Sequence, residues 1–266
     1  MAVVRIGIEA STVLLSMLSR KAIDIDFVKV DGDSSMEMLN EALSYKPVLI
    51  HDINRYFWLN YEDPFKDEVM ATARKMLDAA KPPWFSTGIG ASAEPQGHTL
   101  PYWRGADAAA LQTREKVTEN IIRNARRLKE WLDMPLLLEN FNYHPTNAYE
   151  YICEPTSFSS LIQAIDCDVL LDLSHAQISA YNMGWGDPRS YLKALPLNRV
   201  REIHISHPEV RNGQMLDMHL PIQPLDIELL GWILAHTPAE VVSLEVSDDV
   251  TDELLLQQAA AMREVV

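Results

Sequence analysis

The stretch CDVLLDLSHAQ, residues 167–177, indicates the fold class. A short apolar run typical of a β-strand leads directly into Asp172, whose carboxylate can bind a metal ion. Four other apolar runs end in the same way, in His51 after PVLI, Glu139 after PLLL, His204 after VREI and Glu245 after VVSL. Chemistry in a (β/α)8 barrel occurs at the C-terminal ends of the strands, so the five endings would meet at one mouth. The pattern predicts an α/β TIM barrel with a multi-metal site.

The rest of the chain agrees with repeated βα units that close a parallel sheet. The predicted strands are Val3–Glu9, Asp26–Val30, Pro47–Asp52, Pro83–Gly88, Pro135–Phe141, Asp168–Ser174, Val200–His207 and Val241–Ser247. Between them lie amphipathic segments such as Arg114–Asp133, where apolar residues recur at helical spacing. Three irregular segments follow strands and are expected to overhang the mouth: Ile89–Gly105, Phe141–Pro155 and Pro208–Pro224. At 266 residues the chain matches the size of one barrel, so we expect a single domain, 1–266.

Composition narrows the class of protein. A net charge of −15 disfavours nonspecific attraction to nucleic acid or to an anionic membrane. Cys153 and Cys167 are too few for a disulfide framework or a thiolate zinc site, which favours a reducing cytoplasm. The first residues lack a basic region followed by a long apolar run, and no stretch approaches the roughly 20 apolar residues of a membrane span. We therefore expect a cytoplasmic protein.

Further candidate ligands follow the predicted strands. His175 lies three residues after Asp172, so both side chains can reach the mouth. Asp217 and His219 are two apart in a segment expected to be an extended loop, so they project to the same side and can hold one ion. The full candidate set is His51, Glu139, Asp172, His175, His204, Asp217, His219 and Glu245. Eight mixed imidazole and carboxylate ligands are too many for one ion, and they suit iron, manganese or zinc. Crowded carboxylates would also repel one another unless cations or protons neutralised them.

Each of these residues also has an ordinary structural interpretation when it is taken alone. A strand-end carboxylate can cap the next helix or pair with a lysine, and a lone histidine is usually an ordinary polar residue. Their joint occurrence at strand ends is what favours a metal site. Among the other histidines, His207 fits a functional and a structural role equally, His144 and His98 in the mouth loops are weaker candidates, and His236 at a helix end is expected to be structural.

The order of these residues resembles the xylose-isomerase-like barrel superfamily, especially the trinuclear arrangement of the endonuclease IV family. Several segments are also similar to the multinuclear non-heme iron-dependent oxidases, or MNIOs. These segments are LLLENFNYH (136–144), LLDLSHAQISAYNMG (170–184), DPRSYLKALPLNRVREIHISH (187–207), LDMH (216–219) and SLEVSDD (243–249). The resemblance covers the fifth to eighth strands well and the N-terminal GIEA region weakly.

The resemblance implies a role for each ligand. Glu139 would bridge two metals, Asp172, His204 and Glu245 would complete one of them, and His51 would serve the other. These four shared ligands, Glu139, Asp172, His204 and Glu245, would carry the catalysis. His175, Asp217 and His219 would hold a third metal. One departure is clear, because the family places a histidine at the end of the fourth strand, where this chain has Ser86, Thr87 and Gly88. Either His98 substitutes for it or the position is filled weakly, which would leave a two-metal enzyme.

MNIOs, as the resemblance implies, use two or three irons and dioxygen to oxidise a side chain, often cysteine, in a ribosomally made precursor peptide. A partner protein commonly presents that peptide. Zinc and manganese are the alternative metals. Four aromatic residues of the loops, Tyr143, Tyr102, Trp103 and Trp185, would line a peptide groove or belong to a satellite core.

Three other functions use the same residues. A phosphodiester hydrolase would use the clustered ions to activate water, with Arg55, Arg104 and Arg211 as phosphate ligands, although the acidic net charge opposes it. A sugar isomerase or epimerase would need one metal and a carboxylate base, which makes most of the ligands redundant. A degenerate barrel that binds a peptide without catalysis would require that the site bind no metal. Fold analogy alone does not choose among these functions.

Overall fold

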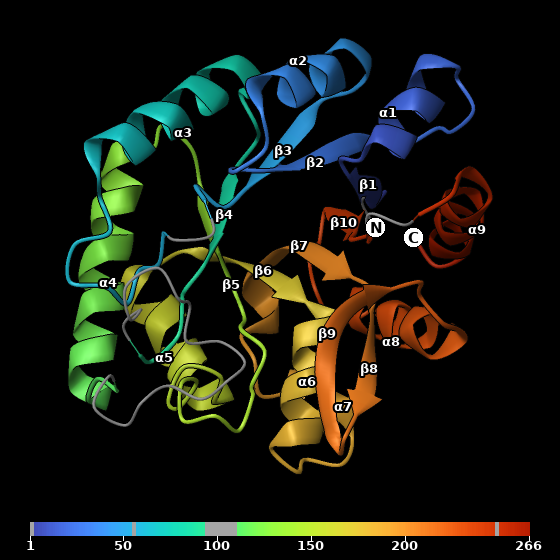
Figure 1. Cartoon of the computed structure of the whole chain (residues 1–266). Coiled ribbons are helices and arrows are strands. Elements are labelled where there is room, and N and C mark those ends of the chain that lie inside the picture. Colours follow the sequence, from blue (N-terminus) through green and yellow to red (C-terminus); the bar gives the residue numbers. More distant parts are fainter. Residues whose placement is uncertain (1–2, 55–56, 94–110, 248–249) are drawn as a thin grey trace.

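A computed structural model describes residues 3–54, 57–93, 111–247 and 250–266. Eight parallel strands close into a barrel in the order β1-β10-β7-β6-β5-β4-β3-β2, surrounded by helices (Figure 1). The barrel strands are β1 (Arg5–Glu9), β2 (Phe27–Asp31), β3 (Val48–His51), β4 (Phe85–Gly88), β5 (Leu136–Glu139), β6 (Asp168–Asp172), β7 (Val200–Ile205) and β10 (Val241–Leu244). The predicted TIM barrel is therefore confirmed, with each of its strands close to the range expected from the sequence.

The helices follow the strands in the alternation expected of βα units. They are α1 (Thr12–Ser19), α2 (Met36–Tyr45), α3 (Asp67–Ala80), α4 (Arg114–Trp131), α5 (Pro155–Ile165), α6 (Leu173–Asn182), α7 (Pro188–Leu192), α8 (Pro224–Leu234) and α9 (Asp252–Arg263), and a 3-10 turn, Leu197–Arg199, precedes β7. Helix α4 confirms the helix expected over Arg114–Asp133, and the Thr113 side chain caps its first turn.

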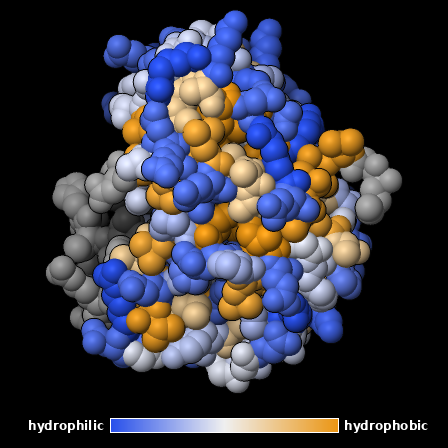
Figure 2. All heavy atoms as spheres, turned by 90° about the vertical axis from the view of Figure 1, so that its right-hand side faces the viewer, coloured by the Kyte–Doolittle hydropathy of each residue, from blue (hydrophilic) through white to orange (hydrophobic). Residues whose placement is uncertain are grey.

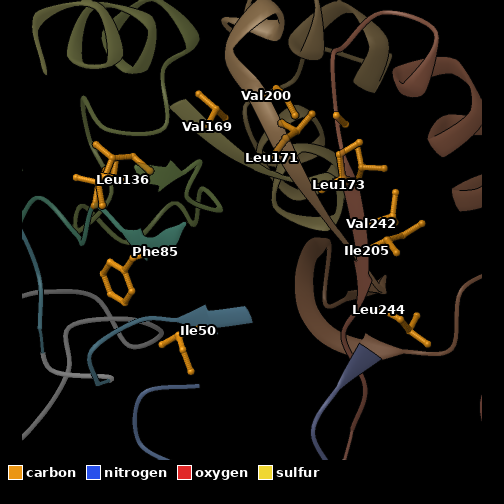
Figure 3. Packing of buried hydrophobic residues seen from close by; sticks show 14 of the residues in the cluster. Ile50, Phe85, Leu136, Val169, Leu171, Leu173, Val200, Ile205, Val242 and Leu244 are labelled. Atoms are coloured by element: carbon orange, nitrogen blue, oxygen red, sulfur yellow. The ribbon is translucent and has the colours of Figure 1, made fainter. Parts of the chain in front are cut away.

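Side chains alternate between the two faces of each barrel strand, and the two faces differ in chemistry. The residues that face the helices are apolar and form the main core, as Figure 3 shows for Ile50, Phe85, Leu136, Val169 and Leu171. The opposite face carries a second, smaller buried cluster of Phe27, Leu49, Trp84, Leu137, Leu170 and Val241. Polar residues stand two positions further along the same strands, at His51 after Leu49, Glu139 after Leu137 and Asp172 after Leu170. The barrel interior is thus apolar below and polar at the mouth.

The expectation of an irregular loop over Pro208–Pro224 is wrong. Strand β8 (His207–Arg211) pairs antiparallel with β9 (Gln214–Leu220) in a two-stranded hairpin beside α6 (Figure 1). Asn212 and Gly213 form its turn with φ values of 53° and 79°, as the two-residue turns favoured by Asn-Gly require. The Asn-Gly pair was the signal in the sequence that should have indicated a hairpin.

The other two expected loops have different outcomes. The segment from Phe141 up to the start of α5 at Pro155 has turns and bends but no strand or helix, as predicted. The segment Ile89–Gly105 is described only as far as Ala93, which forms an isolated bridge with Leu111.

The helices of the described residues differ from membrane-spanning helices in length or hydropathy. None of the helices there combines the length and apolarity that crossing a membrane requires. Figure 2 shows the face around α1, α8 and α9, where hydrophilic residues are interspersed with exposed hydrophobic ones.

Candidate metal centre

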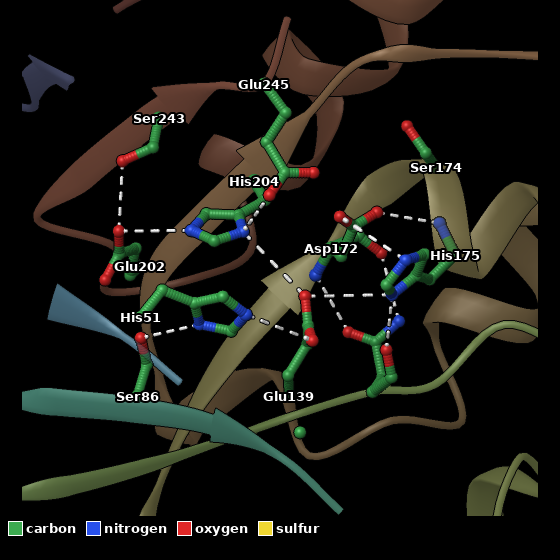
Figure 4. A network of polar contacts seen from close by, with 12 residues as sticks. His51, Ser86, Glu139, Asp172, Ser174, His175, Glu202, His204, Ser243 and Glu245 are labelled. Carbon is green, nitrogen blue, oxygen red and sulfur yellow. Dashed lines mark hydrogen bonds and ion pairs between the residues drawn. The ribbon is translucent and has the colours of Figure 1, made fainter. Parts of the chain in front are cut away.

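The five strand endings meet at the mouth of the barrel. Glu139 is at the centre of the group, and both of its carboxylate oxygens face imidazoles (Figure 4). Its Oε1 lies 3.7 Å from Nδ1 of His175 and 3.8 Å from Nδ1 of His204, while Oε2 lies 3.6 Å from Nε2 of His51. All four side chains are buried. This placement suits the bridging role expected for Glu139.

The two carboxylate oxygens of Asp172 have different surroundings. Its Oδ1 accepts a hydrogen bond from the backbone N–H of His175 at 2.7 Å and so caps α6. Its backbone is held by Asn140, whose side chain accepts from the Asp172 N–H and donates to the Asp172 carbonyl. Its Oδ2 is buried and has no hydrogen-bond partner. The capping and ligand interpretations are therefore compatible, because each uses a different oxygen.

The hairpin brings Asp217 and His219 to the opposite side of His175. Oδ2 of Asp217 lies 3.3 Å from Nε2 of His175 and 3.4 Å from Nε2 of His219. Nε2 of His219 also lies 3.5 Å from Oε2 of Glu245. His219 has a φ of 46°, so the β9 backbone is irregular where this side chain turns toward the mouth. The three residues expected to form a third metal position are thus brought together.

Glu202 was not expected from the sequence, and it lies behind His204. Its carboxylate accepts a hydrogen bond from Trp84 Nε1 at 2.7 Å. It also accepts from Ser243 Oγ at 3.0 Å and lies 3.3 Å from Nε2 of His204 (Figure 4). Nδ1 of His204 is left facing Glu245 Oε1 at 3.0 Å. A carboxylate behind a ligating histidine fixes the ring and its tautomer. The signal in the sequence was the spacing of two between Glu202 and His204, which places both on the inner face of β7.

Lys29 is a second residue that sequence reasoning missed. Its side chain is buried, and Nζ lies 2.7 Å from Glu245 Oε1, 3.1 Å from Asp31 and 3.5 Å from Glu9. Although burial alone would lower the pKa of Lys29, the charges of Asp31, Glu245 and Glu9 raise it well above its usual value. The ammonium is therefore a permanent cation inside the mouth. In the sequence, a lysine within the otherwise apolar strand FVKV was the signal that could have identified this residue.

In the absence of ions, the carboxylates hold protons on the imidazoles. Burial opposes charge on His219, but Glu245 and Asp217 raise its pKa to about 10. The pKa values of His204 and His175 are likewise raised well above the usual value, against burial, by their neighbouring carboxylates. Burial raises the pKa of Asp172 to about 7, with Glu245, Glu139 and Asp217 adding to the effect and His175 opposing it. The centre thus favours added positive charge, supplied here by protons.

The donor set fits metal ions. Among the described residues, three combinations bring potential ligand atoms within 4.8 Å of one another: His51 with Glu139 and His204, Glu139 with Asp172 and His175, and Asp172 with His204 and Glu245. Oδ2 of Asp172 and Oδ1 of Asp217 are buried without a hydrogen bond. Buried polar atoms are normally satisfied, so such a group at a cluster of ligands is an argument for a bound ion. Imidazole and carboxylate donors suit iron, manganese or zinc.

The fourth strand is the place where the ligand set is incomplete. Its end carries Ser86, Thr87 and Gly88, and the Ser86 hydroxyl lies 3.0 Å from Nδ1 of His51. His98, expected as one candidate substitute, is outside the described residues.

Among the remaining candidates, His207 is tied to Asp226 on α8 at 2.8 Å, and His236 stacks on Trp232 at 4.3 Å. His236 has the structural contacts expected of it. Trp185 is exposed and packs edge-on against Tyr191. Two other candidate aromatics, Tyr102 and Trp103, and two candidate phosphate ligands, Arg55 and Arg104, lie outside the described residues.

A pocket of about 500 Å³ opens beside the centre. It is lined by the loop after β5, by α6 and by the hairpin, and His175 and Asp217 belong to its wall. The size is that of a small-ligand site. Its aromatic wall consists of Phe141 and Tyr149 rather than Tyr143 or Trp185, and His144 also lines it. Arg211, the third candidate phosphate ligand, lines it too but is paired with Glu209 at 2.5 Å.

The family follows from the sequence as a whole. Residues 5–266 match the family described as "RiPP precursor modification enzyme MbnB/TglH/ChrH". The chain belongs to this family. RiPPs are ribosomally made and post-translationally modified peptides, so the resemblance to MNIOs is confirmed at the level of the family and of its peptide-modifying activity. Iron, oxidation and the number of ions are finer points than this match establishes.

Relatives and solved structures agree with this placement. A UPF0276 protein of Acaryochloris marina is 27% identical over 194 residues, which cover 73% of this chain and 67% of that protein. A crystal structure of a D-tagatose 3-epimerase-like protein superposes with a TM-score of 0.63 at 15% identity, covering 98% of both chains. Endonuclease IV from Thermus thermophilus superposes with a TM-score of 0.63 at 17% identity, covering 98% of this chain and 99% of its own. At such identities these two structures establish only the shared xylose-isomerase-like fold.

Proposed function

We propose that this MbnB/TglH/ChrH family member is a multinuclear iron enzyme that uses dioxygen to oxidise a side chain, often cysteine, of a ribosomally made precursor peptide. The observation that carries the proposal is the cluster of buried oxygen and nitrogen atoms around Glu139, several without hydrogen bonds, in a chain of this family. A peptide-binding barrel without catalysis gives no reason to bury such a set. We assign the metals to the eight expected residues and catalysis to Glu139, Asp172, His204 and Glu245.

The chain's own residues would hold the metal ions, orient the substrate side chain and shield the ligands from water. Bound ferrous iron supplies open coordination positions and the electrons for reaction with dioxygen. The pocket places a substrate side chain beside His175 and Asp217. Glu202 holds His204 with Nδ1 toward the centre, and Lys29 keeps Glu245 ionised. The burial of Glu139, Asp172 and His204 keeps water from the ligands.

The protein's own thiols are poorly placed to compete as substrates. Cys153 and Cys167 are both buried. Burial raises the pKa of the Cys153 thiol well above its usual value, and it raises that of Cys167 to about 12. Thiols that stay protonated are weak nucleophiles and weak metal ligands. A substrate cysteine therefore comes from a separate peptide, with or without a partner protein that presents it.

The test is an iron count followed by a turnover assay. Anaerobically purified protein is expected to hold two or three irons per chain and to consume dioxygen when a cognate precursor peptide is added. Peptide mass is measured in parallel, with an iron-free sample and a peptide whose target cysteine is replaced by serine as controls. Full activity of the iron-free protein, or peptide cleavage or phosphodiester hydrolysis supported by zinc or manganese alone, would refute the oxidase assignment.

A further inference from the structure

The residue after β3 has an unusual backbone. Asp52 has a φ of 58°, in the left-handed region that glycine, asparagine and aspartate tolerate best. Its N–H donates to the Ser86 carbonyl at 2.8 Å, which holds the turn against β4. This backbone directs the Asp52 side chain back across the end of β4.

One carboxylate oxygen of Asp52 is fully used by β4. Oδ1 accepts from the Thr87 hydroxyl at 2.6 Å and from the Gly88 N–H at 3.0 Å. These bonds fix the carboxylate group and leave Oδ2 as the atom that faces the site, 3.6 Å from Nε2 of His51. That distance exceeds the 2.7–3.2 Å range of hydrogen bonds between nitrogen and oxygen. The two atoms face each other without bonding directly.

His51 is arranged to present a lone pair in this direction. Ser86 Oγ lies 3.5 Å from the Ile50 carbonyl, to which it donates, and 3.0 Å from Nδ1 of His51. When Nδ1–H of His51 donates to this hydroxyl, Nε2 presents its lone pair toward the centre. Nε2 then lies 3.6 Å from Asp52 Oδ2 and 3.6 Å from Glu139 Oε2. Nε2 of His51 thus lies between carboxylate oxygens of two other residues.

Gly88 explains why an aspartate is needed here. A Cβ built on Gly88 would lie 3.8 Å from Glu139 Oε2 and 3.2 Å from the Phe141 ring. A side chain at position 88 would therefore begin beside the Phe141 ring and Glu139, where glycine supplies no donor atom. Asp52 approaches the same strand end from β3 and binds the Gly88 N–H.

We infer that Asp52 is a metal ligand of this centre and completes, through Oδ2, the ion held by His51 and Glu139. It takes the place of the ligand that the end of β4 does not supply. The inference rests on the proposed metal centre and adds a ninth residue to it. It also accounts for an aspartate in a backbone conformation that favours glycine.

The first test removes the ligand oxygen without disturbing the turn. Asp52→Asn keeps an acceptor for Thr87 and Gly88, and Asp52→Gly suits the φ of 58° without any side chain. Binding of Mn²⁺ alone to metal-free protein is measured by calorimetry and by equilibrium dialysis. Both variants are expected to lose one ion per chain or to bind it at least tenfold more weakly, with the remaining ions unchanged. Asp133→Asn, on an exposed aspartate paired with Arg74, is the matched control.

A second variant separates ligation from loop packing. Adding Gly88→His to Asp52→Asn supplies a nitrogen donor from β4, and it should restore the lost ion once the Phe141 ring, 3.2 Å from a Cβ at position 88, gives way to the new side chain. Full Mn²⁺ binding by both single variants, or a folded double variant that does not regain the ion, would overturn the role of Asp52. A wild-type protein that binds neither Mn²⁺ nor iron would instead refute the proposed function, so the two failures are distinguishable.

Discussion

The mouth of the barrel neutralises its buried carboxylates in two different ways. On the side of β1, β2 and β10, Glu9, Asp31 and Glu245 surround the ammonium of Lys29 at 2.7–3.5 Å. On the side of β3, β5 and β6, the ion-pair partners of Glu139 within 4 Å among the described residues are the imidazoles of His51, His175 and His204, and Asp172 Oδ2 has no hydrogen bond. The first side therefore carries its cation on a fixed side chain, whereas the second depends on imidazoles, which can exchange protons.

The two sides of the mouth differ in whether the positive charge beside their carboxylates is fixed or exchangeable. Buried carboxylates are stable only when positive charge or protons accompany them. The raised pKa values of His175, His204 and His219 show that protons meet this need when no ion is bound. Lys29 is covalently fixed, so the positive charge beside Glu245 does not depend on an ion from solution.

The largest effect is expected from Asp172, on the side without a fixed cation. Asp172→Asn keeps a capping oxygen for α6, because asparagine caps as well as aspartate, but it removes the charged ligand. Activity should fall by more than the roughly 10–100-fold seen when residues behind a ligand are lost. At least one ion should also be lost, as counted by elemental analysis.

Asp172→Ala removes the cap as well, and it should cost a further 0.5–2 kcal/mol, or about 1 kcal/mol typically, in urea unfolding. Equal stability of the two variants would show that the cap contributes nothing, and retained iron in Asp172→Asn would remove Asp172 from the ligand set.

The next largest effect should come from the opposite side, at Lys29. Lys29→Met leaves three carboxylates without their cation, and removing one partner of a buried pair costs about 3–5 kcal/mol. Metal-free protein should lose about that much stability in urea unfolding, and added Mn²⁺ should restore part of it by replacing the ammonium.

Lys46→Met is the matched control, since Lys46 pairs with the exposed Asp24 at 3.1 Å and should lose under about 1 kcal/mol. Similar losses in the two variants, with no response to Mn²⁺, would mean that the two sides of the mouth do not differ in the way described.

The sequence predicted the candidate ligands that meet at the mouth better than it predicted the residues that contact them. His51, Glu139, Asp172, His204 and Glu245 were found because each ends an apolar run, and parallel strands bring such endings together. Lys29 and Glu202 also lie on inner faces, but within strands, where a single polar residue in an apolar run has several explanations. Their partners come from β10, β1 and β4, and strand spacing alone does not identify contacts between distant strands.

The hairpin was missed for a different reason. Asp217 and His219 were correctly expected on one side of an extended segment, yet its pairing depends on the Asn212–Gly213 turn and on an irregular register between β8 and β9. Asp52 was missed because its role depends on a left-handed backbone and on the absence of a side chain at Gly88. Neither feature has a periodic pattern in sequence.

The smallest expected effect is the loss of one proton at the hairpin end. His219 has its pKa raised to about 10 in the metal-free protein, so at about pH 8 it carries a proton that a metal must displace. Calorimetry of Mn²⁺ binding in buffers of different ionisation enthalpy counts the released protons. His219→Ala should release about one fewer proton per chain and bind the ion next to Asp217 more weakly, while His236→Ala, just beyond the end of α8, should match the wild type.

The raised pKa of His219 also sets how the stability of the metal-free protein and its metal binding change with pH. In metal-free protein, the raised pKa contributes stability that is complete below about pH 6.5 and is lost as the pH rises through about 10. Metal binding has the opposite dependence and strengthens with pH over this window, up to about tenfold per unit for each displaced proton. In His219→Ala the slope should fall by one proton. An unchanged slope would place His219 outside the centre, leaving Asp217 and His175 as its hairpin-side ligands.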